Sequence, residues 1–164
     1  MELLINSPKH GQKIVLLDDE DAAELILPSI CIWRGVNRGI SYYAIYHVPK
    51  QDKQIKLHRY LLGITDPSIR VDHINRNGLD NRRCNLRLAT PSQNQHNKVA
   101  YRNNKSGYKG VSWHKGGRKW IAQIKCGEIH KYLGLYRSKE DAANAYNQAA
   151  LWLHGEFAVL NSIK

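Results

Sequence analysis

The sequence predicts an α+β protein built from small parts joined in series. Three observations support this class: short alternating apolar runs typical of strands, two segments with helix-capping signals, and a charge balance that changes along the chain. Residues 1–57 are predicted to be a β-rich N-terminal segment, and residues 58–98 a strand–loop–strand–helix (ββα) unit. Residues 99–106 are a basic linker, and residues 107–164 a three-stranded antiparallel sheet packed on one helix.

The N-terminal segment has the pattern of a small β-rich platform. Ile14–Leu17 is a short apolar run followed by four acidic residues, which suit the start of a short helix because negative charge is favourable there. Residues 30–33 and 42–46 are predicted strands joined by a glycine-bearing turn. The main expectation is that this segment supports the next unit by packing. The alternative is DNA contact through Arg34 and Arg38.

The middle of the chain alternates strand and turn signals. Val71–Ile74 is a strand candidate, and Asn77–Gly78 is a strong turn signal. Apolar and polar side chains alternate in Asn85–Ala89, as expected for a returning strand. Residues 90–93, Thr-Pro-Ser-Gln, form a capping box with proline at the first helical position. A helix is therefore expected to begin near Pro91, which completes the ββα order.

Side chains of this unit offer the chemistry that phosphodiester hydrolysis needs, namely a base for water and a cation near the departing oxygen. His73 suits the base, because its unperturbed pKa lies near neutrality. Asp72 and Asn94 offer oxygen ligands to one divalent metal ion, Mg²⁺ in the first place and Mn²⁺ as the second choice. Asn85 is expected to fix the loop or to orient the imidazole. The side chains expected to bind neighbouring phosphates are Arg82, Arg83 and Arg87.

This unit resembles the HNH (ββα-metal) nucleases of the homing type. D-H at 72–73, N-L at 85–86 and S-Q-N at 92–94 occur in the order of that family. The resemblance implies that His73 activates water, that Asp72 and Asn94 bind the metal, and that Asn85 supports the imidazole. L-H-R at 57–59 is similar to a segment upstream of the motif in phage-type members, which makes His58 a secondary candidate, structural or phosphate-contacting. Asn94 stands where many members have histidine.

The C-terminal part predicts three strands and one helix. Residues 108–113, 119–125 and 130–135 are the strand candidates. Ser138 is a predicted N-cap with acidic residues behind it, and helical spacing continues to Gly155. Basic and aromatic residues interleave on the strands, and such a thin sheet fits the DNA major groove. The interleaved polar positions include Lys109, His114, Arg118, Lys119, Gln123, Lys125, His130 and Tyr132.

Residues 106–161 resemble the plant ethylene-response-factor (APETALA-type) DNA-binding domain. Y-K-G-V, K-W-I-A-Q-I-K, Y-L-G-L-Y and E-D-A-A-N-A-Y-N-Q-A-A follow one another as in that family. The resemblance implies DNA contact at Lys109, Ser112, His114, Gln123, Lys125, His130 and Tyr132, and a core position for Trp120. Because Lys, Ser or His replaces several family arginines, the plant target sequence is not expected to transfer.

The charge distribution indicates a polyanionic partner. Net charge is +11, and residues 1–57 contribute none of it, with seven basic and seven acidic side chains. A basic two-thirds joined to a neutral third favours double-stranded DNA, with general solubility as the plainer explanation. A membrane surface is disfavoured because no segment pairs a basic face with a long apolar one. The sequence implies no obligate protein partner and leaves monomer or dimer open.

Cysteine usage and the N-terminus predict an intracellular protein, encoded by a phage or mobile element or acting in a bacterial cytoplasm. The three cysteines lie far apart without a C-x-x-C pair, so neither a zinc knuckle nor a disulfide framework is indicated. No signal peptide and no segment long enough to span a bilayer occur.

Together these features predict a metal-dependent, site-directed DNA endonuclease of homing, mobile-element or phage type, which nicks duplex DNA. The competing prediction is a non-catalytic, sequence-specific DNA-binding regulator that uses the same basic parts. An RNA-binding protein is a weaker alternative, because the sheet aromatics do not follow an RNP pattern.

Overall fold

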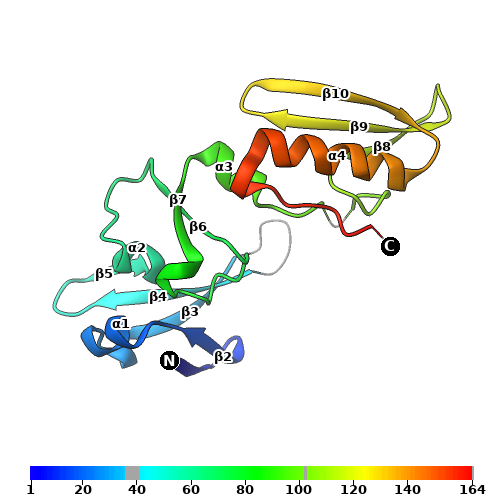
Figure 1. Ribbon diagram of the computed structural model, residues 1–164. Helices are drawn as coiled ribbons and strands as arrows, with labels where there is room; N and C mark the ends of the chain where they lie inside the picture. The colour runs from blue at the N-terminus through cyan, green and yellow to red at the C-terminus, as the bar shows by residue number, and fades with distance from the viewer. Residues whose placement is uncertain (36–40, 102, 164) are drawn as a thin grey trace. The chain divides into compact units, whose positions relative to one another are not determined.

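A computed structural model describes residues 1–35, 41–101 and 103–163 of the chain (Figure 1). It divides the chain into two compact units, Met1–Pro91 and Ser92–Lys164. The architecture is mixed α+β with small sheets and few helices, as predicted. Most of the predicted turn after Arg34 lies outside the described residues, and Arg38 with it.

Among its described residues, the first unit contains two antiparallel sheets and two short α-helices before the predicted strand–loop–strand. A two-stranded hairpin comes first, and its first strand was not predicted from the sequence. A three-stranded sheet of order β3-β4-β5 follows. The elements are β1 (Glu2–Ser7), β2 (Gly11–Leu16), α1 (Asp19–Glu24), β3 (Ile30–Gly35), β4 (Ser41–Val48), β5 (Lys53–Lys56) and α2 (Leu57–Leu61).

The core of this unit joins the N-terminal segment to the following loop. Val15, Leu17, Ala44 and Leu57 are fully buried, and Leu79 from the loop packs in the same cluster. Burial of such side chains is the main favourable term in folding. Backbone hydrogen bonds also hold the loop to the N-terminal segment. The Leu16 N–H donates to the Leu79 carbonyl at 2.9 Å, and the Leu16 carbonyl accepts from the Asn81 N–H at 2.8 Å. The N-terminal segment therefore packs directly under the loop between the two hairpin strands.

The predicted strand–loop–strand is an antiparallel pair, β6 (Arg70–His73) and β7 (Leu86–Ala89). Asn85 does not lead the second strand, because it ends a 3₁₀ turn, η2 (Arg83–Asn85), just before it. The helix α3 (Pro91–His96) begins at the predicted proline. The division between the units falls inside α3, whereas the sequence suggested a boundary near residue 98.

The second unit is a three-stranded antiparallel sheet packed on one helix, as predicted. The first strand begins later than expected, at Val111. Ser138 caps the helix, because its Oγ accepts from the Asp141 N–H at 3.0 Å, and Gly155 ends it with a φ of 52°. The elements are β8 (Val111–His114), β9 (Lys119–Cys126), β10 (Ile129–Tyr136), α4 (Lys139–His154) and η3 (Gly155–Phe157), with sheet order β10-β9-β8.

Small side chains form the contact between this sheet and its helix. Ala122 on β9 and Ala142, Ala143 and Ala150 on α4 are fully buried. Ile124 packs in the same face of β9, so the predicted alternation of core and outward positions on this strand is confirmed. Alanines let a helix lie close to a sheet, and the outward face is left to polar side chains.

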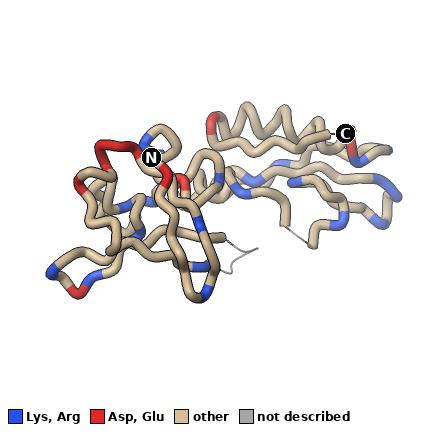
Figure 2. The backbone as a smooth tube through the Cα atoms, turned by 90° about the horizontal axis from the view of Figure 1, so that it is seen from below, with Lys and Arg blue, Asp and Glu red and all other residues tan. Residues whose placement is uncertain are grey.

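Charge is spread unevenly along the chain (Figure 2). The acidic residues of α1 cluster beside the N-terminus, where the Met1 ammonium pairs with Asp19 at 2.8 Å. Lys and Arg recur along the strands and turns of the second unit. Among the described residues, no helix combines the length and apolar character that crossing a membrane requires.

Candidate functional site

The β6–β7 pair carries Asp72 and His73 in succession at the end of β6, and each residue is only 6% exposed. Asp72 lies opposite Arg87 in the strand register. The Arg87 Nε and Nη2 groups both donate to the Asp72 Oδ2 atom, at 3.0 and 2.9 Å. Because both partners are largely buried, this pair fixes the position of the Asp72 carboxylate.

His73 lies among aromatic and amide side chains. Its ring centroid lies 4.8 Å from that of His58, nearly perpendicular at 89°, and 6.1 Å from that of Tyr43. Burial lowers the pKa of His73 from 6.5, and the nearby Asn81 amide and the charges of Asp72 and Asp80 only partly oppose it. The imidazole is therefore neutral near pH 7, which is the form that can accept a proton.

His58 is the second buried imidazole of this site, and it is 4% exposed. Burial first, and then His73, Lys56 and Arg59, lower its pKa to about 3. Its Nδ1 atom is buried and has no hydrogen-bond partner among the described residues. The upstream L-H-R segment thus contributes a neutral ring directly beside His73. The position of His58 in the sequence did not determine that the two rings are neighbours.

The loop between the strands is held by a closed network of side chains. The Asn85 Oδ1 atom accepts from the Asn75 N–H at 3.0 Å, and the Asn85 Nδ2 atom donates to the Asp80 carbonyl at 2.8 Å. The Asp80 carboxylate accepts from Arg82 Nε at 2.8 Å and Nη2 at 2.7 Å. Asn85 therefore lies in the hydrogen-bond network that holds the loop, and its support of the imidazole stays a prediction.

The predicted phosphate-binding arginines of this unit have acidic partners. Arg82 pairs with Asp80, and Arg83 Nη2 lies 2.6 Å from Asp21 Oδ1 on α1. Both guanidinium groups remain about half exposed, whereas Arg87 is buried against Asp72. Phosphate binding by these arginines stays a prediction.

Asn94, the other predicted metal ligand, lies half-buried on α3. This helix packs within the second unit, where the Lys109 Nζ atom donates to the His96 carbonyl at 2.5 Å. The role of Asn94 as a cation ligand therefore stays a prediction.

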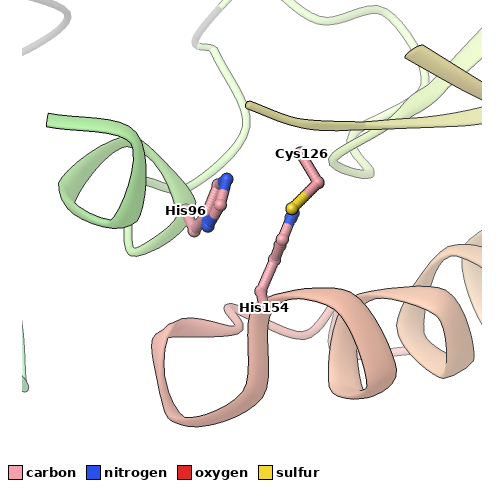
Figure 3. Close-up of side chains that lie close together, drawn as sticks. All are labelled: His96, Cys126 and His154. Carbon is pink, nitrogen blue, oxygen red and sulfur yellow. The ribbon is translucent and has the colours of Figure 1, made fainter. Parts of the chain in front are cut away.

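His96, Cys126 and His154 form a separate cluster in the second unit, with one potential ligand atom of each residue within 4.8 Å of the others (Figure 3). The two imidazoles stack with centroids 3.6 Å apart and planes 11° from parallel. Lone pairs in two parallel planes do not converge on one ion, and His154 Nε2 lies 3.0 Å from the Lys125 carbonyl. In this arrangement the cluster packs α3 on α4. His96 is buried, with 9% of its surface exposed.

The predicted DNA-contacting positions of the C-terminal sheet are mostly on its open face. Gln123 and Lys109 are half-buried, and the Lys109 ammonium contacts α3. Trp113 lies opposite Trp120 in the strand register and meets it edge-on at 5.1 Å, so both lie on the face that packs against the helix, where Trp120 borders the core and Trp113 remains exposed. The exposed predicted positions are Ser112, His114, Arg118, Lys119, Lys125, His130 and Tyr132.

Comparisons with known proteins support the nuclease interpretation. Residues 63–96 match the family model described as HNH endonuclease. A protein of Acanthamoeba polyphaga mimivirus, described as an uncharacterized HNH endonuclease, is 37% identical over 115 residues, which cover 67% of this chain and 59% of that protein. Protein 3.8 of Escherichia phage T7 is 29% identical over 128 residues, which cover 72% of this chain and 95% of that protein.

The C-terminal resemblance has narrower support. An ethylene-responsive transcription factor of Medicago truncatula is 38% identical over 66 residues, which cover 39% of this chain and 27% of the plant protein. No solved structure matches the chain. The chain spans 59% of the length of its mimivirus relative and nearly all of the phage protein. What the comparisons establish is that residues 63–96 are similar to an HNH endonuclease domain.

Proposed function

We propose that this protein is a metal-dependent, site-directed endonuclease that nicks duplex DNA, of the homing, mobile-element or phage type. One observation carries the proposal: a buried, neutral imidazole, His73, follows directly after a buried carboxylate, Asp72, at the end of a strand. The similarity of residues 63–96 to HNH endonucleases and the viral origin of two relatives support it. Such a protein would act inside the infected or host cell.

In this proposal His73 accepts the proton of the attacking water, while Asp72 and Asn94 hold one divalent cation, Mg²⁺ in the first place. The donor set suits such an ion, because carboxylate and amide oxygens are hard donors. When bound, the cation would neutralise charge on the departing oxygen. Asn85 and Asp80 keep the loop between the two strands in shape.

The C-terminal sheet would select and hold the DNA site. Its exposed face carries alternating basic and polar side chains, including Lys119, Lys125 and His130. Tethering such a sheet to the nuclease raises the local DNA concentration, so each part can bind weakly by itself. Affinity that depends on phosphate contacts should fall steeply as salt increases, and a flat salt response would contradict this part of the proposal.

The test is cleavage of supercoiled plasmid in the presence of Mg²⁺. Wild-type protein should convert plasmid to the nicked form, and both chelator and His73→Ala should abolish the conversion. His47→Ala is the matched control, because His47 is an exposed histidine on β4 of the same unit. Nicking that survives His73→Ala would refute the assignment of the base.

A regulator that binds DNA without cutting it is the second candidate. The observation that favours it is the Asp72–Arg87 pair, since a guanidinium already supplies the counter-charge that a cation would provide. The same assay separates the two functions: retained DNA binding without cleavage of any substrate, with Mg²⁺ or Mn²⁺, would favour the regulator.

A further inference from the structure

An exposed aromatic shelf lies on the β3-β4-β5 sheet of the first unit. Trp33 on β3 and Tyr43 on β4 are directly opposed in the strand register, so both point to the same face. Their ring centroids lie 5.9 Å apart, and Trp33 is 47% exposed. A large aromatic side chain on an outer sheet face is not explained by the core, which lies elsewhere in this unit.

The Lys56 ammonium lies over the two rings of this shelf. Lys56 ends β5 opposite Ile45 and therefore shares the face of Tyr43, two residues earlier on β4. Its Nζ atom lies 4.9 Å from the Tyr43 ring centroid and 5.7 Å from that of Trp33. An ammonium within about 6 Å of an aromatic face is attracted to it, so the two rings restrict where this flexible side chain puts its charge.

The shelf adjoins the two buried imidazoles. The Tyr43 ring centroid lies 6.1 Å from those of both His58 and His73. The charge of Lys56 also contributes to lowering the pKa of each of these histidines. A phosphate bound by the Lys56 ammonium would therefore lie close to the group that we assign as the base.

The surroundings of Lys56 favour an anion. Partial burial, and then the charges of Arg59 and Arg70, lower the pKa of its ammonium. Within the part of the chain that the structure describes, no carboxylate forms an ion pair with it. The ammonium thus lies among cations and aromatic rings, where a phosphodiester would supply the missing counter-charge.

We propose that Lys56, positioned on Trp33 and Tyr43, is a substrate-binding residue that contacts a backbone phosphate of the DNA strand beside the scissile bond. This inference rests on the proposed endonuclease function, and it assigns to the N-terminal sheet a binding task in addition to its packing. The shelf supplies a single phosphate contact, whereas the aromatic faces fix the direction from which the strand approaches.

The experiment compares full-length Lys56→Gln, Lys56→Arg and Lys53→Gln with wild type. Lys53 is the matched control, because it is an exposed lysine of the same strand that faces the other side of the sheet. Binding of a labelled duplex is measured in chelator at a series of salt concentrations, and nicking is measured with Mg²⁺. Thermal melting of each variant verifies that it is folded.

Lys56→Gln should weaken binding about tenfold at low salt, the value of one charge-assisted contact. It should also reduce the slope of log affinity against log salt by about 0.9, and raise the KM for nicking. Lys56→Arg keeps the charge and the stacking and should stay near wild type, as should Lys53→Gln. If Lys56→Gln binds and cuts like Lys53→Gln, the inference is overturned. If wild type never cuts, the endonuclease proposal fails, while the binding slopes still decide the role of Lys56.

Discussion

At the scale of single residues, burial decides the chemistry of this site. Asp72 and His73 are adjacent in the sequence, yet their environments differ: the carboxylate is paired with a guanidinium, and the imidazole is kept neutral. His58 adds a second neutral ring at 4.8 Å, so protonating either imidazole disfavours a charge on the other. These environments lead to two predictions about function and stability.

The first prediction concerns the pH dependence of cleavage. A general base works in its deprotonated form, so activity should be lost as pH falls through the pKa of His73. Because that pKa is lowered from 6.5, kcat/KM should be level above about pH 6.5, with an acid limb whose midpoint lies below 6.5. The measurement is nicking between about pH 5 and about pH 9 under subsaturating DNA. A midpoint at or above 6.5 would contradict the environment assigned to His73.

The second prediction concerns the Asp72–Arg87 pair. Arg87→Ala would leave a buried carboxylate without its guanidinium, and breaking such pairs costs about 3 kcal/mol or more in the free energy of unfolding. Urea unfolding followed by tryptophan fluorescence measures this loss. Arg70→Ala is the control on the same hairpin, since Arg70 is exposed, and it should change stability by less than about 0.5 kcal/mol. Equal stability of the two variants would show that the pair contributes little.

At the scale of secondary-structure elements, close approach between α4 and the β-sheet defines the second unit. The helix brings alanines and Tyr146 to the sheet, and Gly110 lies beneath the Tyr146 ring with a φ of +75°. A side chain at this glycine would overlap the ring and would lie 2.6 Å from the Gln123 carbonyl. Gly110 is therefore required both for its backbone conformation and for its lack of a Cβ atom.

The third prediction tests this packing. Gly110→Ala should lower the free energy of unfolding by about 2 to 4 kcal/mol, since overpacking adds to the strain of a positive φ. Gly127→Ala is the matched control, with a φ of +59° and nothing within 4 Å of the added Cβ, and it should cost only about 1 kcal/mol. Chemical denaturation of both variants measures the difference. If both substitutions cost the same, contact with Tyr146 is not the cause.

At the scale of the whole molecule, both units bury neutral histidines. His58 has its pKa lowered to about 3 in the first unit, and His96 to about 4 in the second. In the unfolded chain these side chains titrate near 6.5, so below that pH the unfolded state binds more protons than the folded state. Stability from these groups is complete above about pH 6.5 and is lost as pH falls toward their folded pKa values.

The fourth prediction follows from this linkage. The free energy of unfolding should decrease as pH falls from about 6.5 toward about 4, by up to about 1.4 kcal/mol per pH unit for a fully buried group. His58→Phe removes one such group and should make the decrease shallower. Denaturation at a series of pH values measures the slope. A stability that is constant over this range would contradict the neutral, buried state of His58.

Much of the local structure followed from sequence patterns. The strand of Asp72 and His73, the helix start at Pro91 and the Ser138 cap all depend on residues a few positions apart. Side-chain alternation likewise predicted the core face of β9. The first strand of the chain was not predicted, although Leu3, Leu4 and Ile5 form a short apolar run, and its pairing with β2 is seen only in the structure.

The sequence by itself determined which chemical groups are present, the D-H pair, and the local elements that carry them, because capping, turn and alternation signals act over a few residues. Only the tertiary structure decided their partners. It brought His58 next to His73, placed Asn85 among the hydrogen bonds of the loop, joined Arg83 to Asp21 across the first unit, and packed α3 with α4. Burial, charge pairing and the resulting pKa values depend on residues distant in the sequence, and no local pattern specifies those contacts.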